Sequence, residues 1–111
     1  MPTPNANDGV LISDTWAELV PAPTSGTRVV TLATIFNADT APVRLSVAIF
    51  NAEANARRFI LEVALASDDS CAPVSDGERL VLRPNRSLQA VLAGPTTTRQ
   101  PDFTVSWEEW A

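Results

Sequence analysis

The sequence has no histidine, no lysine and no tyrosine, and its 111 residues include one cysteine. Without histidine, the Ser-His-Asp and Cys-His arrangements of nucleophilic catalysis are excluded, and the most common general base at neutral pH is missing. A zinc site built from cysteine and histidine is excluded as well. Cys71 cannot form a disulfide within the chain, so this is not a disulfide-stapled secreted scaffold. We therefore predict a protein that is not an enzyme and that uses no cofactor.

The remaining candidates for catalysis are weak. Cys71 lies in a stretch that holds three aspartates, Asp68, Asp69 and Asp76. Their negative charges are expected to raise the pKa of the thiol and to make it a poor nucleophile. The pair Glu108-Glu109 does not suit glycoside hydrolysis, because adjacent residues on a strand point to opposite faces of the sheet.

The sequence also lacks a long apolar run and an excess of positive charge. No apolar segment approaches the roughly 18 residues that span a bilayer. The net charge of -5 argues against binding to nucleic acids or to anionic membranes, since both need clustered basic residues. Residues 1–9 have neither the basic nor the apolar region of a signal peptide. We expect no nucleic-acid or membrane partner, and a chain that folds in a reducing cytoplasm.

What the sequence does contain is a β pattern. Hydrophobic residues make up 45% of a chain whose length fits one domain. In residues 43–49, large apolar side chains alternate with Arg, Ser and Ala, a period of two that is typical of a strand with one buried face. Residues 29–36 are rich in β-branched side chains. Because the turn-favouring segment 37–42 lies between them, we predict that residues 27–51 form an antiparallel hairpin at the centre of the fold.

Further segments fit the same pattern: residues 10–12, 16–20, 57–66, 78–83, 87–93 and 103–107. The polar interval 67–77 is predicted to be a long loop. Seven or eight short strands with regular turn signals favour an all-β fold, and we predict a single antiparallel β-sandwich, immunoglobulin-like or jelly-roll-like. We place this sandwich at residues 10–111. Residues 1–9 have no periodicity and are predicted to be an N-terminal arm or an irregular start.

One loop is a candidate for calcium binding. Asp68-Asp69-Ser70, with Asp76 and Glu78, supplies the oxygen ligands that calcium prefers. The spacing fits no EF-hand motif, and a solvated acidic loop is the alternative. We assign no metal site.

Four residues are candidates for a contact with another protein: Trp16, Arg57, Arg58 and Trp110. Tryptophan and arginine are enriched at the hot spots of interfaces. Trp110 has the parity opposite to Trp107, which we expect in the core, and it lies at the end of the chain. The alternatives are that Trp16 and Trp110 close open ends of the sandwich and that the two arginines are solvated.

From Leu19 to Glu109 the chain resembles small β-sandwich structural proteins of tailed bacteriophages. The resemblance begins with Val20-Pro21, Gly26 and a strand that ends at Asn37. It continues in L-x-L-x-P-x-x-S-L-x-A-x-L-A-G, which matches residues 80–94, and in a closing strand at residues 103–109. It implies a virion component that has no catalytic residues and that contacts other virion proteins and copies of itself.

These observations lead to one main hypothesis and two rivals. The main hypothesis is a non-enzymatic structural subunit of a tailed phage or phage-like particle, in the neck, tail or capsid decoration, that assembles in many copies through strand edges and termini. The first rival is a carbohydrate- or ligand-binding module in which Trp16 or Trp110 stacks on a sugar. The second is a small bacterial immunoglobulin-like adhesion domain.

Overall fold

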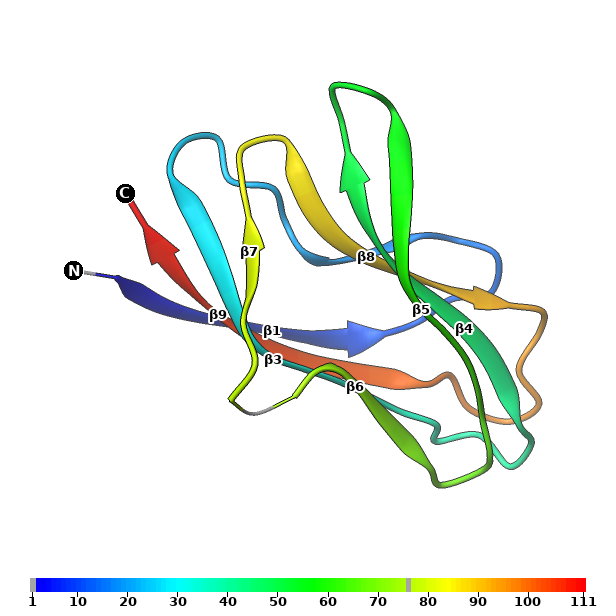
Figure 1. Ribbon diagram of the computed structural model, residues 1–111. Helices are drawn as coiled ribbons and strands as arrows, with labels where there is room; N and C mark the ends of the chain where they lie inside the picture. The colour runs from blue at the N-terminus through cyan, green and yellow to red at the C-terminus, as the bar shows by residue number, and fades with distance from the viewer. Residues whose placement is uncertain (1, 76) are drawn as a thin grey trace.

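The computed structural model of the chain describes residues 2–75 and 77–111. Every regular element in this part of the chain is a β-strand, and the strands form two antiparallel sheets that pack face to face (Figure 1). The predicted all-β sandwich is therefore confirmed, with nine strands among the described residues in place of the expected seven or eight. The described residues include no helix that is long and apolar enough to cross a membrane.

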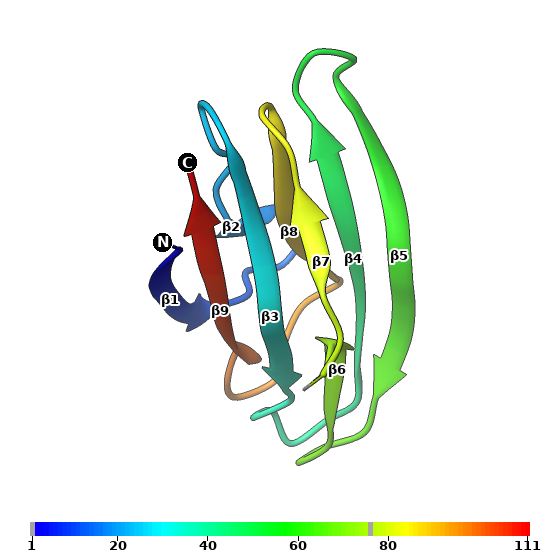
Figure 2. The same ribbon diagram turned by 60° about the vertical axis from the view of Figure 1, so that its left-hand side comes forward.

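The two sheets have five and four strands. The first sheet contains, in spatial order, β1 (Thr3–Val10), β9 (Asp102–Trp110), β3 (Thr27–Phe36) and β6 (Ser70–Val74), and β7 (Leu80–Leu82) follows β6 along β3. The second contains β2 (Ala17–Val20), β8 (Arg86–Ala93), β4 (Val43–Asn51) and β5 (Ala56–Leu65). In Figure 2 the β4–β5 and β7–β8 turns lie at one end of the sandwich, here called the upper end. The β3–β4 and β5–β6 connections lie at the opposite, lower end.

The core lies between the two sheets and follows the alternation of the sequence. On β4 the inward side chains Val43, Leu45, Val47 and Ile49 are buried. Trp107 on β9 is buried as its parity predicts. A buried side chain of this size stabilises the fold by roughly 1.5–3 kcal/mol relative to an exposed one. The two inner faces therefore supply most of the cohesion between the sheets.

The predicted hairpin of residues 27–51 is wrong. β3 belongs to the five-stranded sheet and β4 to the four-stranded sheet, so the two strands pack across the core and do not pair. The turn-favouring residues between them do reverse the chain, but they carry it from one sheet to the other. Periodicity reports which side chains are buried, and it does not report which strand is the hydrogen-bonded neighbour.

The expectation of an irregular N-terminus is also wrong for the described residues. Thr3–Val10 forms β1 and pairs with β9 in regular antiparallel register, from Thr3 opposite Glu109 to Val10 opposite Asp102. Most side chains of β1 are exposed, so backbone hydrogen bonds define this strand and no burial pattern reveals it. The short strand expected at residues 10–12 is absent, and Leu11 is instead fully buried in the core. The division of the chain into an arm, 1–9, and a sandwich, 10–111, stays a prediction.

The long loop expected at residues 67–77 is interrupted by a strand. Ser70–Val74 forms β6 and pairs with the last residues of β3, with Cys71 opposite Ile35. The pairing is irregular, because the register shifts between Ala33 and Ile35. Pro73 and the polar neighbours of this strand hide it in the sequence, since an edge strand tolerates residues that a central strand excludes.

A polar network at the lower end fixes the connection between β3 and β4. Asn37 is fully buried, and its side-chain amide donates to the carbonyl oxygens of Ala41, Leu65 and Ala66 at 3.0–3.1 Å. Its side-chain oxygen accepts a hydrogen bond from the backbone N–H of Asp39 at 3.0 Å. Buried polar groups that are satisfied in this way specify one arrangement of the backbone.

The carboxylate of Asp39 joins the same network to the β8–β9 loop. It accepts hydrogen bonds from the backbone N–H groups of Thr40, Thr97 and Thr98 at 2.8 Å, and from the Thr98 hydroxyl at 3.0 Å. The Thr97 N–H is the largest cause that holds the pKa of Asp39 well below its ordinary value of 3.8, and those of Thr98 and Thr40 add to it against the opposing effect of burial. The ionised carboxylate is therefore part of the fold.

Replacing Asp39 by Asn should lower the midpoint of thermal unfolding by several degrees at pH 7, because the new amide places a donor against backbone donors. Folding lowers the pKa of Asp39, so its contribution is complete above the unfolded-state pKa of about 4 and is lost progressively as the pH falls below that value. The difference between wild type and variant should therefore narrow from pH 7 to pH 2. Thermal unfolding followed by circular dichroism measures this.

The control is Asp102→Asn, an exposed aspartate at the same end of the sandwich, which should leave the midpoint unchanged. An Asp39→Asn variant as stable as wild type at pH 7 would contradict the structural role of this carboxylate.

Candidate interaction surface

One side of the sandwich is open between the edges of the two sheets. β5 is the edge strand of the four-stranded sheet, and β6 and β7 form the facing edge of the other sheet (Figure 2). Along this open side the exposed apolar residues Ile60 and Val81 keep 37% and 50% of their surface accessible. Toward the lower end, Ile60 lines a hollow of about 200 Å³ with Pro73, Val74 and Leu80. The open side is therefore partly apolar and partly unfilled.

At the upper end of the open side lies a cavity of about 360 Å³ with a basic lining. Its walls come from the β4–β5 and β7–β8 segments: Ile49, Asn51, Ala56, Arg57, Arg58, Val81, Arg83 and Arg86. Four of the eight arginines of the chain therefore gather at one place in a protein whose net charge is -5. The sequence analysis did not name Arg83, Arg86 or Val81 as candidates. The available signal was the pair of arginines at the two ends of the turn 83–86.

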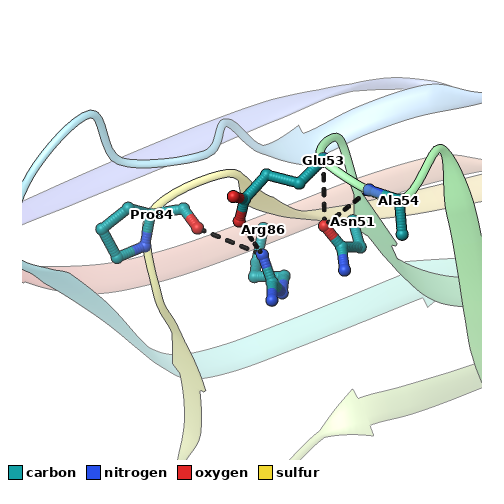
Figure 3. A network of polar contacts seen from close by, with 5 residues as sticks. All are labelled: Asn51, Glu53, Ala54, Pro84 and Arg86. Atoms are coloured by element: carbon teal, nitrogen blue, oxygen red, sulfur yellow. Dashed lines mark hydrogen bonds and ion pairs between the residues drawn. The ribbon is translucent and has the colours of Figure 1, made fainter.

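Polar contacts hold the turns beside this cavity together. Arg86 donates from Nη1 to Glu53 at 3.2 Å, and the same atom lies 3.4 Å from the carbonyl oxygen of Pro84 (Figure 3). The side-chain oxygen of Asn51 accepts hydrogen bonds from the backbone N–H groups of Glu53 and Ala54 (Figure 3). The β4–β5 turn is thereby fixed to the β7–β8 turn.

Aromatic side chains pack on part of the outer face of the four-stranded sheet. The rings of Trp16 and Phe59 meet edge to face, with 5.7 Å between their centroids. The guanidinium carbon of Arg57 lies 4.3 Å from the centroid of Trp16 and 4.8 Å from that of Phe50. Ala48, which lies on the outward face of β4, is fully buried. These contacts form a second, smaller apolar layer outside the main core.

A bulge in β5 explains why Phe59 belongs to this outer layer. Leu61 pairs with Val47, but Phe59 pairs with Ala48, so Ile60 is an extra residue in β5. The extra residue moves Phe59 from the inward parity of Leu61 to the outward face. The alternation of residues 57–66 in the sequence could not show this shift.

The four residues expected at an interface lie in three different places. Trp16 and Arg57 come together in the outer aromatic layer, and Arg57 also lines the basic cavity. Arg58 pairs with the inward residue Ile49 and lines the basic cavity. Trp110 lies at the end of β9, opposite Thr27, with 44% of its surface exposed. Their role in a contact with another protein stays a prediction.

The acidic residues considered for calcium do not converge. Asp68 and Asp69 lie in the exposed β5–β6 turn, whereas Glu78 follows at the other end of β6 and accepts hydrogen bonds from Ser75 that lower its pKa. Asp76 lies outside the described residues. Within residues 2–75 and 77–111, no three potential metal ligands lie close enough together to hold an ion.

Cys71 and the pair Glu108-Glu109 are the other groups that the sequence offered for catalysis. Burial, and to a lesser degree the charge of Asp69, raises the pKa of the Cys71 thiol. The pKa of the thiol is raised, as the sequence predicted, but burial contributes more than the aspartate charge that the prediction rested on. Glu108 and Glu109 take separate partners, since Glu108 pairs with Arg79 at 3.3 Å and Glu109 with Arg28 at 2.6 Å. They do not form a carboxylate pair.

No protein-family model and no curated protein matches the sequence. In three dimensions the chain is similar to a solved structure of Bacillus endospore appendages, described as "a novel family of disulfide-linked pili". The TM-score is 0.54, the identity is 8%, and the match covers 98% of this chain and 86% of the other. At this identity the likeness shows a shared β-sandwich fold, and the tailed-phage resemblance receives no separate support.

The two tryptophans provide a matched test of the outer aromatic layer. Trp16→Ala should lower the free energy of unfolding by about 2 kcal/mol, because it removes the edge-to-face contact with Phe59 and the cation–π contact with Arg57. Trp110→Ala should have a smaller effect, of about 0.5 kcal/mol, since 44% of the surface of this residue is exposed. Urea unfolding of both variants measures the difference, and equal effects would contradict the assignment of Trp16 to a packed layer.

Proposed function

We propose that this protein is a non-enzymatic structural subunit that associates with copies of itself, through sheet edges and chain ends, in an assembly on a surface or particle. The observation that supports this most is the open side of the sandwich, where Ile60 and Val81 are exposed beside unpaired strand edges. Exposed apolar patches on soluble proteins mark interaction sites. Unpaired edges favour pairing with another chain. The same features would be a liability in a protein that works alone.

The structural comparison supports the same class of function. The similar solved structure comes from pili, and a pilus is a polymer of protein subunits. A sandwich of this shape is thus compatible with assembly. Arg58, which lines the basic cavity of the open side, and Trp110, which is exposed at the end of β9, stay candidates for the contacts between copies.

The mode of linkage we propose is non-covalent. The similar pili are described as disulfide-linked, whereas this chain has one cysteine. One thiol can bond to one neighbour only, so disulfides alone would join two subunits and end there. The thiol of Cys71 is also half-buried and has a raised pKa, so it reacts poorly in thiol–disulfide exchange.

The phage context is a finer form of this proposal, with the virion as the location. It is supported by the sequence resemblance alone, and it would require neighbouring genes for portal, terminase or tail proteins. The carbohydrate-binding alternative is weakened at Trp16, because Arg57 and Phe59 of the same chain already contact this ring. No specific observation favours it at Trp110.

Substitution on the open side tests the proposal. Wild type should self-associate at micromolar concentrations or above, and the double variant Ile60→Ser/Val81→Ser should do so at least about tenfold more weakly, because the apolar contact area is lost. Light scattering coupled to size-exclusion chromatography measures the masses.

The matched control is Ile12→Ser, which replaces an isoleucine that is 51% exposed away from the open side, and it should associate like wild type. A wild-type protein that remains monomeric at every concentration would overturn the proposed function.

A further inference from the structure

Two exposed features of opposite charge lie at opposite ends of the sandwich. The basic cavity lies at the upper end, between the β4–β5 and β7–β8 turns. The exposed aspartates Asp68 and Asp69 lie in the β5–β6 turn at the lower end. Because the strands run from one end to the other, the two features lie at opposite ends of one protomer and cannot meet within it.

The basic cavity has unused binding capacity. Arg86 already pairs with Glu53, and the guanidinium of Arg57 is engaged by Gln89 at 3.0 Å and by the aromatic layer. Arg58 and Arg83 form no salt bridge with a carboxylate of the described residues. An arginine presents a planar fork of donors that fits a carboxylate with two hydrogen bonds. These two side chains are therefore suited to bind carboxylates from outside.

The walls of the cavity are held in place before any ligand arrives. The backbone N–H of Ala52 donates to the carbonyl oxygen of Asn85 at 2.9 Å, which joins the two turns directly. The Arg86–Glu53 pair joins them a second time (Figure 3). A site whose walls are already ordered loses less conformational entropy on binding.

The acidic turn is presented with the same rigidity. The backbone N–H of Asp68 donates to the carbonyl oxygen of Asn37 at 3.0 Å, and the N–H of Asn37 donates to that of Asp69 at 2.8 Å. The side chain of Asn37 holds the preceding carbonyls of Leu65 and Ala66. The buried network of the lower end therefore fixes the backbone of the turn that carries the two adjacent carboxylates.

We infer that the basic cavity of one protomer binds the Asp68-Asp69 turn of a second copy, so that subunits join head to tail along the strands. The inference rests on the proposed function, and it adds to the open-side contact a second contact between the two ends of the sandwich. A cavity of about 360 Å³ accommodates two short carboxylate side chains. A contact between two different surfaces leaves one free surface at each end of the pair, so it continues into a filament unless it closes into a ring.

Paired neutralisation of the two surfaces tests this contact. The cavity variant is Arg58→Gln/Arg83→Gln, and the turn variant is Asp68→Asn/Asp69→Asn. All four side chains are exposed, and asparagine tolerates the left-handed φ of 61° at Asp68, so both variants should fold like wild type. Each should associate about tenfold or more weakly than wild type, because the charge pairs of the contact are lost.

The mixture of the two variants gives the sharper result. Each variant keeps one intact surface, so an equimolar mixture should form a one-to-one heterodimer that neither variant forms alone to the same extent. Native mass spectrometry distinguishes these masses. Raising the salt to 1 M NaCl should dissociate this heterodimer, since the pairs are partly exposed to screening.

The controls remove the same number of charges elsewhere. Arg44→Gln/Arg99→Gln and Glu18→Gln/Glu62→Gln change exposed residues outside both surfaces, and they should associate like wild type. If wild type assembles and the cavity and turn variants assemble equally well, the head-to-tail contact is overturned while the proposed function stands. If wild type does not assemble at all, both are overturned.

Discussion

The buried pair Asn37 and Asp39 is the interaction on which the rest of the structure depends. Together they satisfy the polar groups of the β3–β4 connection, of the end of β5 and of the β8–β9 loop. These are the segments in which the chain passes between the two sheets at the lower end. The apolar faces supply the cohesion, but they do not choose among strand orders. The polar network defines one crossing of the chain from the first sheet to the second.

The same network links the fold to the proposed contact. The backbone of Asn37 forms hydrogen bonds with the backbone of Asp68 and Asp69, so the acidic turn is attached to a buried residue. At the other end, the Glu53–Arg86 pair and the Ala52–Asn85 hydrogen bond fix the wall of the basic cavity. Hydrogen bonds therefore hold the backbone of both surfaces that are proposed to meet.

Sequence reasoning predicted burial well and pairing poorly. The period of two in the sequence predicted which side chains of β4 are buried and that Trp107 lies in the core, and the structure confirms both. β1 escaped prediction because its partner, β9, is almost one hundred residues away and its side chains remain exposed. The bulge at Ile60 in β5 moves Phe59 from the inner to the outer face of the sheet, and no feature of the sequence pattern indicates it. Of the candidate interface residues, Arg58 was named from the sequence, but its neighbours Arg83 and Arg86 become a cluster only through folding.

Sedimentation velocity of the wild-type protein over a concentration series, in the presence of a thiol reductant, tests the central claim of non-covalent self-association most directly. We expect a weight-average sedimentation coefficient that rises steadily with concentration, because head-to-tail contacts do not stop at a dimer, and that falls again at high salt. A single species with the 11.9 kDa mass of one chain at every concentration would contradict it.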